Sequence, residues 1–400
     1  MAIETPPLSE RASFPVPLGK RNNNLVLPPS AFVRWLKLPL CVTFLLSSAV
    51  SINITQLVGQ PLYYVSRNWY EAWTEYTKQL FGIVVIFITQ YWTPLKVSIT
   101  GNSSVAGLFS INAKTGLLET HFDGRAIVIS NHQLYSDWIF LWWVAFTARY
   151  HGNIFIMLKD SLKHIPIFGW GMRNYRFLFL SRSWVKDEKT LTEGLSRINR
   201  DSDWPAWLIL FPEGTTISRN GVAKSRAFAE KQTPALRSPS HLLLPRSRGL
   251  RFSIEQLHET VEYIYDSTIY YSDIPEGVFG EDHFTLRRMY LQGVYPSSIA
   301  MYWRRYRIAD IPWQDEAKFE KWIYDRWYEK DALLQHYHKT GQFTDPENEA
   351  GNDDIPTLEA PVRLSNTVGD VFKIFVVPIT TGLLVRLGYN ALTRIASNAF

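Results

Sequence analysis

The sequence has very little cysteine and lacks the short motifs that mark several common enzyme classes. Its one cysteine, Cys41, excludes a disulfide within the chain and any Cys-x-x-Cys pair. The sequence also has no Gly-x-Ser-x-Gly elbow, no phosphate-binding Walker loop and no His-Glu-x-x-His zinc motif. These absences argue against serine hydrolases, nucleotide hydrolases and zinc enzymes, and predict a protein without a metal site or a bound cofactor.

Concentrated positive charge is also absent, although the formal net charge is +5. The charges are scattered, and no zinc-finger spacing, basic zipper or RNA-recognition signature appears, so a nucleic-acid partner is not expected. What the chain does have is 15 Trp and 20 Tyr, residues that favour the interface between a membrane and water. The composition therefore suits a protein at a lipid surface or one with a phosphate-bearing substrate.

The N-terminal region divides into a polar tail and apolar segments. Residues 1–30 are rich in Pro, Asn and Ser and predict a disordered tail without the Arg-rich helix of a mitochondrial presequence. The uncharged run from Leu38 to Val58 is long enough to cross a bilayer. Arg34 and Lys37 precede it, which favours a cytoplasmic N-terminus. We expect residues 31–96 to form membrane-associated helices.

Two further apolar runs allow alternative structures. Leu80 to Pro94 is too short to span a bilayer comfortably, so it predicts an interfacial or re-entrant helix, or the partner of the first helix in a hairpin. Val371 to Val385 predicts either an anchor or an amphipathic surface helix within a C-terminal segment, 366–400. The acidic, Pro-containing stretch before it predicts a linker over residues 341–365.

Residues 97–340 have the pattern of a catalytic α/β domain. Short apolar runs at Ala126–Ser130 and Trp207–Phe211 predict buried strands, and Asp137–Phe146 and Asp187–Ile198 predict helices. Strands alternating with helices predict an α/β fold, here a mixed sheet flanked by helices. Functional residues in such folds follow the carboxyl ends of strands.

The run Asn131-His132-Gln133-Leu134-Tyr135-Ser136-Asp137 directly follows the first of these strands. If His132 lies in the loop and Asp137 in the first helical turn, the carboxylate can hold one ring nitrogen and leave the other as a base. Ser136 or Asp137 is then a plausible helix cap, and the alternative is that Asp137 only caps the helix while His132 is a surface or satisfied core residue. Since no serine or cysteine nucleophile accompanies the pair, the pattern favours a reaction in which the substrate supplies the attacking hydroxyl.

Three other sequence blocks carry candidate binding residues. Glu213, Gly214 and Thr215 follow the second strand, where glycine permits a tight turn against a ligand. Arg182 ends a strand-like run and is a natural phosphate ligand. Pro245 follows another apolar run and, with Gly249 nearby, predicts a turn.

Taken in order, these four blocks resemble the glycerolipid acyltransferase superfamily, typified by the 1-acylglycerol-3-phosphate O-acyltransferases. The first block is Asn131-His132 with Asp137, the second Phe179 to Arg182, the third Phe211 to Thr215 and the fourth Leu244-Pro245. Further similarity to the lysocardiolipin and lysophosphatidylinositol acyltransferase branch lies in the segments 224–231, 265–269 and 326–330. Many lysophosphatidate enzymes carry Arg where this chain has Thr216, which favours an acceptor that already bears a headgroup.

The resemblance implies a membrane enzyme that moves an acyl group from acyl-CoA to a lysophospholipid. His132 would be the general base, and Asp137 would orient it. The substrate would be bound by Arg182, Glu213, Gly214, Thr215, Asn131 and Pro245. The alternatives are a 1-acylglycerol-3-phosphate acyltransferase, a CoA-independent transacylase, a hydrolase and a non-enzymatic lipid-binding protein. We expect the endoplasmic reticulum as its location, with the mitochondrial outer membrane as the alternative.

Overall fold

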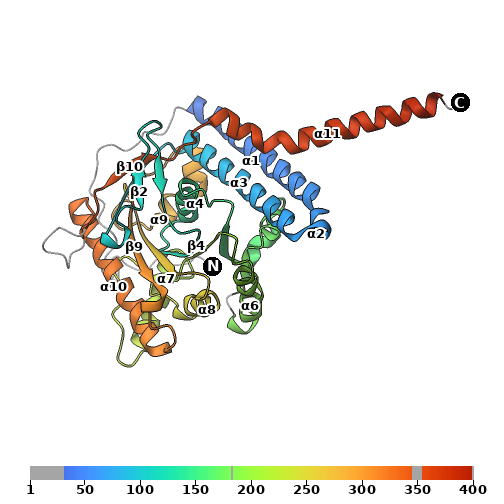
Figure 1. Cartoon of the computed structure of the whole chain (residues 1–400). Helices are drawn as coiled ribbons and strands as arrows, with labels where there is room; N and C mark the ends of the chain where they lie inside the picture. Colours follow the sequence, from blue (N-terminus) through green and yellow to red (C-terminus); the bar gives the residue numbers. More distant parts are fainter. Residues whose placement is uncertain (1–30, 182, 345–353, 399–400) are drawn as a thin grey trace, which may run out of the picture.

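The computed structural model describes residues 31–181, 183–344 and 354–398. In these residues, eight strands form one mixed sheet in the order β10-β1-β9-β8-β4-β7-β5-β6, and β2 and β3 form a separate hairpin (Figure 1). The strands are β1 (Lys96–Gly101), β2 (Phe109–Ile111), β3 (Leu118–Thr120), β4 (Arg125–Ser130), β5 (Ile154–Lys159), β6 (Leu178–Leu180), β7 (Ala206–Leu210), β8 (Tyr263–Tyr271), β9 (Ser298–Arg307) and β10 (Leu358–Pro361).

Helices cover both faces of this sheet, so the predicted fold class is confirmed. The α-helices are α1 (Ala31–Gly59), α2 (Leu62–Val65), α3 (Arg67–Trp92), α4 (Asp137–Thr147), α5 (Phe168–Asn174), α6 (Trp184–Arg200), α7 (Arg219–Glu230), α8 (Ser247–Leu257), α9 (Gly280–His283), α10 (Glu316–Thr340) and α11 (Thr367–Asn398). The shorter helical turns are η2 (Ser103–Val105), η3 (Asp160–His164), η4 (Arg287–Leu291) and η5 (Ile308–Asp310).

The centre of the sheet is parallel. Strand β4 lies between β7 and β8 and runs parallel to both. The carboxyl ends of β4 and β7, at Ser130 and Leu210, therefore lie at the same edge of the sheet. This places the loop after Ser130 beside the loop after Leu210, although some eighty residues separate them in the chain.

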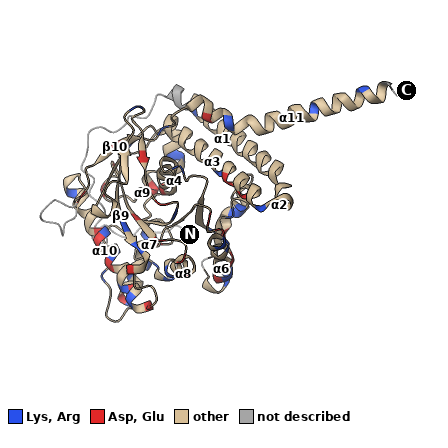
Figure 2. Ribbon diagram, viewed as in Figure 1, with Lys and Arg blue, Asp and Glu red and all other residues tan. Residues whose placement is uncertain are grey.

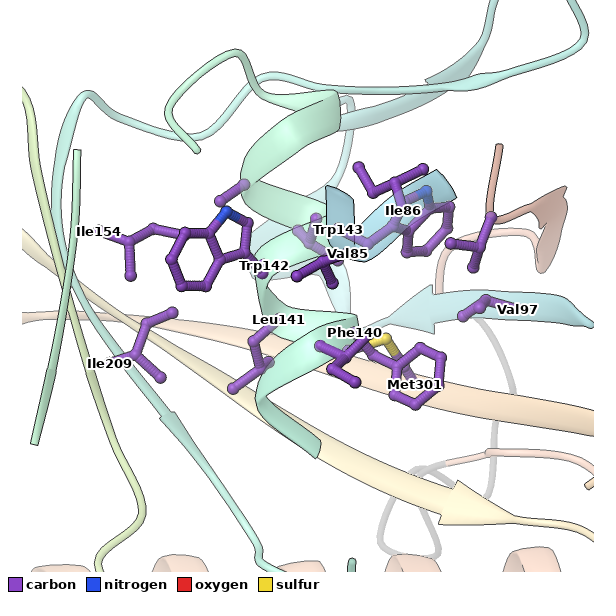
Figure 3. Packing of buried hydrophobic residues seen from close by; sticks show 14 of the residues in the cluster. Val85, Ile86, Val97, Phe140, Leu141, Trp142, Trp143, Ile154, Ile209 and Met301 are labelled. Carbon is purple, nitrogen blue, oxygen red and sulfur yellow. The ribbon is translucent and has the colours of Figure 1, made fainter. Parts of the chain in front are cut away.

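Strand β4 is apolar along its whole length because both of its faces are buried. Ala126 and Val128 belong to one apolar cluster, and Ile127 and Ile129 to a second. The first cluster includes residues of α3 and α4, among them Trp142, which Figure 3 shows on the side of Ile154, and Trp143, which it shows beside Ile86 of α3. The second includes residues of α6, α8 and α10. The continuous apolar run in the sequence is thus a strand between two layers of helices.

The N-terminal apolar segments form a helical hairpin. Helices α1 and α3 pack against each other, so the hairpin alternative for the run from Leu80 to Pro94 is confirmed. That run is the second part of α3, which begins earlier, at Arg67. Helix α11 packs on α1 and α3 through its first part, where the Ser51 hydroxyl donates to the Ile374 carbonyl over 2.6 Å. The rest of α11 projects away from the body of the protein (Figure 1).

Two helical stretches are long and apolar enough to cross a membrane, Trp35–Val65 and Thr367–Ser397. Their outer faces expose large apolar side chains, including Trp35 and Leu387. Figure 2 shows few charged residues along α1 and α11, whereas α6 and α10 carry both signs of charge. Exposed apolar surface of this extent indicates association with a membrane.

The range predicted to be a linker, 341–365, contains a strand. Residues Leu358–Pro361 form β10, which pairs antiparallel with β1 at the edge of the sheet. The prediction missed it because the acidic residues before it dominate the composition of the range. The segment predicted to be a disordered tail, residues 1–30, lies outside the described residues.

Candidate active site

The His132 and Asp137 side chains meet at the edge where β4 ends. The Nδ1 of His132 lies 2.8 Å from Oδ2 of Asp137, and since an ionised carboxylate only accepts hydrogen bonds, Nδ1 donates. The Asp137 side chain is fully buried, whereas the His132 side chain is 18% exposed. Within the described residues, Nε2 of His132 makes no hydrogen bond. The ring is therefore oriented with one nitrogen held and the other available as a base.

The Asp137 carboxylate accepts two more hydrogen bonds. The backbone N–H of Leu134 donates to Oδ2 over 3.0 Å, and the hydroxyl of Tyr271 donates to Oδ1 over 2.5 Å. Burial and the neighbouring Asp137 carboxylate raise the pKa of Tyr271 well above its usual value, so the phenol remains a donor. Three donors therefore hold the Asp137 carboxylate in one orientation.

The helix-cap alternative for this pair does not describe the structure. Ser136 precedes the first helical residue, yet its side chain makes no capping hydrogen bond. Its hydroxyl instead contacts the sulfur of Met289 at 3.7 Å. Asp137 is the first residue of α4, but its carboxylate bonds to His132, Leu134 and Tyr271 rather than to the helix. The sequence did not reveal Tyr271, because only the pairing of β8 with β4 brings it here.

The Glu213 side chain links the His132 loop to the segment before Pro245 by accepting hydrogen bonds from backbone N–H groups of both. Its Oε1 accepts from the N–H of His132 over 3.1 Å, and its Oε2 accepts from the N–H of Leu243 over 3.2 Å. The side chain is buried, and burial raises its pKa from 4.5 to about 8, while the two backbone donors act in the opposite direction. Phe211, two residues earlier, stacks on the His132 ring with centroids 4.2 Å apart. The block after β7 thus fixes the position of the histidine.

Gly214 is exposed and Thr215 is half-buried in this turn. Gly214 has a φ of +71°, a conformation that glycine adopts without strain. The Arg246 side chain lies over it, about 3.5 Å from where a Cβ would stand. Thr216 is buried, and its hydroxyl donates to the Glu281 carboxylate of α9. The position that carries Arg in many lysophosphatidate enzymes therefore points into the protein here.

The remaining predicted site residues are placed as follows. Asn131 is buried, and its side-chain amide bonds both the carbonyl and the N–H of Ile269, at 3.0 Å and 2.7 Å, which ties the end of β4 to β8. Pro245 is buried, and the next N–H, of Arg246, donates to the Pro212 carbonyl over 2.8 Å. Gly249 lies within α8 rather than in a turn. Arg182 lies outside the described residues.

The segments 265–269 and 326–330, which resemble the lysocardiolipin branch, contact each other. Lys330 of α10 and Asp266 of β8 form a buried ion pair, and the Lys330 ammonium also donates to the Ser267 carbonyl over 2.6 Å. Asp331, the next residue, accepts from the backbone N–H groups of Ser240 and His241. Because removing one partner of a buried pair leaves an uncompensated charge, these segments hold α10 and the chain before Pro245 against the sheet.

An apolar cavity of about 550 Å³ lies between the helical hairpin and the sheet. Its wall includes Ile52 of α1, Val85 of α3, Trp138 of α4 and Leu158 of β5. Trp138 directly follows Asp137 in α4, so one helix contributes both to the His–Asp pair and to the cavity wall. A space of this size with an apolar lining can hold a hydrocarbon chain.

One part of the cavity wall is strained. Ile167 has a φ of +66°, which is unfavourable for a β-branched residue, and the N–H of Phe168 donates to the Pro166 carbonyl over 2.7 Å. Asn53 of α1 holds this turn by donating to the Ile167 carbonyl over 2.9 Å. Strained residues concentrate at ligand sites, which agrees with the place of this turn on the cavity.

Among the described residues, no three His, Cys, Asp or Glu side chains are grouped so that they could hold a metal ion. The His–Asp pair, the buried glutamate and the apolar cavity form the candidate site. The site therefore combines a base, His132, with a cavity that can hold an acyl chain.

Comparison with known proteins places the chain in a family. The acyltransferase family matches residues 106–272, and the family called acyltransferase C-terminus matches residues 289–363. The chain is 37% identical to a 2-acyl-1-lysophosphatidylinositol acyltransferase of Saccharomyces cerevisiae, over 77% of this chain and 82% of that protein. It is 38% identical to an uncharacterized acyltransferase of Schizosaccharomyces pombe, over 85% and 93%.

A vertebrate protein gives a weaker match of the same kind. The chain is 31% identical to lysocardiolipin acyltransferase 1 of Gallus gallus, over 76% of this chain and 73% of that protein. All four sequence blocks lie within residues 106–272, the range that the acyltransferase family matches. The chain therefore belongs to the acyltransferase family, within the glycerolipid acyltransferase superfamily.

Proposed function

We propose that this protein transfers a fatty acyl group from acyl-CoA to a free hydroxyl of a lysophospholipid. The observation that carries the proposal is the His132–Asp137 pair with Nε2 available, held by the same helix, α4, that forms part of the wall of an apolar cavity. The relatives add support, because two of them are named for lysophosphatidylinositol and lysocardiolipin.

In this mechanism, His132 is the general base. Its Nε2 takes the proton of the acceptor hydroxyl as the oxygen attacks the thioester carbon of acyl-CoA. The tetrahedral intermediate collapses with cleavage of the C–S bond, and His132 returns the proton to the CoA thiolate. The products are the diacyl phospholipid and free CoA, and no covalent acyl-enzyme forms.

The other residues orient the base and the substrates. Asp137 fixes the His132 tautomer and stabilises the imidazolium that forms during attack. Glu213 and Asn131 hold the His132 loop in place through backbone contacts, and Gly214 and Thr215 border the acceptor. Arg182 binds phosphate, and Pro245 shapes the floor of the site. The apolar cavity takes an acyl chain.

The acceptor carries a headgroup on its phosphate. Thr216 supports this, because it is buried against Glu281 and brings no cation to the site. A phosphate monoester, with its higher charge, would gain more from a guanidinium at that position. Lysophosphatidylinositol and lysocardiolipin both carry a phosphodiester, so either fits better than lysophosphatidate.

The site works at a bilayer, where the tails of both substrates lie. The exposed apolar faces of α1 and α11 support this placement. We propose the endoplasmic reticulum as the compartment, because the positive flank before the first apolar segment favours a cytoplasmic N-terminus.

One assay tests the function and its rivals. Purified protein in detergent would receive labelled oleoyl-CoA and, in separate reactions, lysophosphatidylinositol, lysocardiolipin and lysophosphatidate. We expect labelled phospholipid with the first two acceptors and less with the third. Product formed from labelled phospholipid without acyl-CoA would instead support a transacylase. Free labelled fatty acid alone would support a hydrolase, and no turnover at all would contradict enzymatic function.

A further inference from the structure

A single charge stands on the wall of the apolar cavity. Among the described residues that line it, Arg287 alone carries a formal charge, and it is exposed. Its guanidinium makes no hydrogen bond or ion pair within the part of the chain that the structure describes. The next residue differs, since Arg288 contacts the ring of His283 at 3.5 Å. Arg287 is therefore a free cation at the point where the cavity meets solvent.

The turn that carries Arg287 is fixed next to the proposed catalytic pair. Arg287 is the first residue of η4, a single π-helical turn. Such turns are rare in proteins, and those that occur often lie at functional sites. Two residues on, Met289 contacts the hydroxyl of Ser136, the residue before Asp137. Tyr290 contacts Thr89 of α3 at 3.4 Å between hydroxyl oxygens. The turn is thus anchored to both α4 and α3, the two helices that flank the cavity.

The apolar lining of the cavity determines which part of a ligand can contact Arg287. A ligand with a long apolar chain gains most by burying that chain in the cavity, which leaves its polar end at the exposed edge. An arginine with an unoccupied guanidinium binds phosphate oxygens in a bidentate manner. Thr216 is uncharged, and its hydroxyl bonds to Glu281, so it offers no cation for a phosphate.

We propose that Arg287 binds a phosphate of the acyl-chain substrate whose tail occupies the cavity, and so sets substrate affinity. This inference rests on the proposed acyltransferase function. The phosphate belongs either to the lysophospholipid or to CoA, since both join a phosphate to an acyl chain. Arg287 acts by binding rather than by proton transfer, so its removal affects KM and leaves kcat nearly unchanged.

The test compares Arg287→Ala and Arg287→Lys with a matched control, Arg200→Ala. Arg200 is an exposed arginine at the end of α6, away from the cavity wall, and it also makes no side-chain hydrogen bond or ion pair in the described part of the chain. Initial rates would be measured against lysophosphatidylinositol at saturating oleoyl-CoA, and against oleoyl-CoA at saturating lysophosphatidylinositol. Thermal unfolding would check that each variant is folded.

We expect Arg287→Ala to raise one KM by about tenfold or more, with kcat within about twofold of the wild type. Arg287→Lys should recover part of the loss, because it keeps the charge but not the bidentate contact. A raised KM for the acceptor assigns the phosphate to the lysophospholipid, and a raised KM for oleoyl-CoA assigns it to CoA. If both KM values match those of Arg200→Ala, the proposal is wrong.

A binding measurement separates this result from failure of the proposed function. Equilibrium binding of radiolabelled ligand to the purified protein measures occupancy without turnover. We expect Arg287→Ala to weaken binding of lysophosphatidylinositol or of oleoyl-CoA by about tenfold, and to leave binding of the uncharged monooleoylglycerol unchanged. If wild-type protein has no transferase activity, this comparison still decides the role of Arg287. Equal weakening for all three ligands would contradict a phosphate contact.

Discussion

At the scale of single residues, the Asp137 carboxylate is the most constrained group of the site. It is fully buried and accepts from His132, Leu134 and Tyr271. A buried carboxylate is stable only when such donors replace water. The orientation of the histidine therefore depends on a tyrosine from another strand as well as on the sequence motif itself.

Removal of the Tyr271 hydroxyl should reduce activity. Tyr271→Phe deletes one donor to Asp137, and a hydrogen bond to a charged group is worth about 1.5–3 kcal/mol, so we expect kcat to fall roughly tenfold or more. Tyr270→Phe is the control, since its hydroxyl contacts His338 at 3.3 Å on the other face of β8. Steady-state rates would compare the two variants. Equal rates would show that Tyr271 does not support the pair.

Glu213 should make stability depend on pH. Folding raises the pKa of its carboxyl from 4.5 to about 8, because the side chain is buried. The stabilisation from this group is therefore complete below pH 4.5 and is lost as the pH rises through 8. We expect the Tm of the wild type to fall across this window more than that of Glu213→Gln, whose amide does not titrate. Parallel Tm profiles from pH 5 to 9 would contradict this assignment.

At the scale of elements, the apolar cavity depends on the fit between the helical hairpin and the sheet. Helices α1 and α3 form one side, and α4, β5 and the η3–α5 segment form the other. Because α1 exposes its outer face, neighbouring residues on it have opposite surroundings. Ala49 lines the cavity, whereas Val50 is 42% exposed.

Filling the cavity from α1 should change chain-length preference. Ala49→Phe places a ring where the end of a long acyl chain would lie, and overpacking of this kind costs about 1–3 kcal/mol. We expect the rate with oleoyl-CoA to fall about tenfold relative to lauroyl-CoA. Val50→Phe adds the same ring on the outer face and should leave the ratio unchanged. The same ratio in both variants would place the acyl chain elsewhere.

The elements next to the motifs could be predicted from the sequence, because their local patterns are strong. Buried parallel strands give unbroken apolar runs, so β4 and β7 were identified, and α4 follows from the apolar run after Asp137. The first half of α3 falls within the helical range expected for residues 31–96 but has no apolar run of its own, because polar residues such as Thr77 and Lys78 are buried there. Gly249 suggested a turn, yet α8 contains it.

Non-local contacts account for what the sequence could not reveal. Tyr271 reaches Asp137 only because β8 pairs with β4, and the Lys330–Asp266 pair needs α10 to fold back on the sheet. The sequence shows that position 216 is a threonine rather than an arginine. Its contact with Glu281 could not be predicted, because that contact depends on where α9 lies in the fold. Spacing in the chain carries no information about such pairs.

At the scale of the whole molecule, apolar surface is concentrated on α1 and α11, away from the charged helices α6 and α10 (Figure 2). The first part of α11 is anchored, since Ile374 is fully buried. Beyond Pro378 the helix exposes residues such as Leu383 and Leu392. The distal part of α11 therefore adds apolar surface without supporting the core.

Truncation should separate these two roles of α11. A chain that ends at Pro378 keeps the Ile374 contact, so we expect an unchanged Tm and unchanged activity in detergent. Its co-flotation with lipid vesicles should fall several-fold, because apolar area that binds the bilayer is lost. Circular dichroism and flotation would be measured on the same preparations. A lower Tm, or undiminished flotation, would show that the distal helix has a different role.

The central claim is that His132 removes the proton from a lipid hydroxyl that attacks acyl-CoA directly. The most direct measurement is the single-turnover rate of transfer from labelled oleoyl-CoA to lysophosphatidylinositol by wild-type protein and by His132→Ala. We predict that the variant folds with the same circular dichroism spectrum and transfers about 10²–10⁴ times more slowly. Transfer by folded His132→Ala at the wild-type rate would contradict the mechanism.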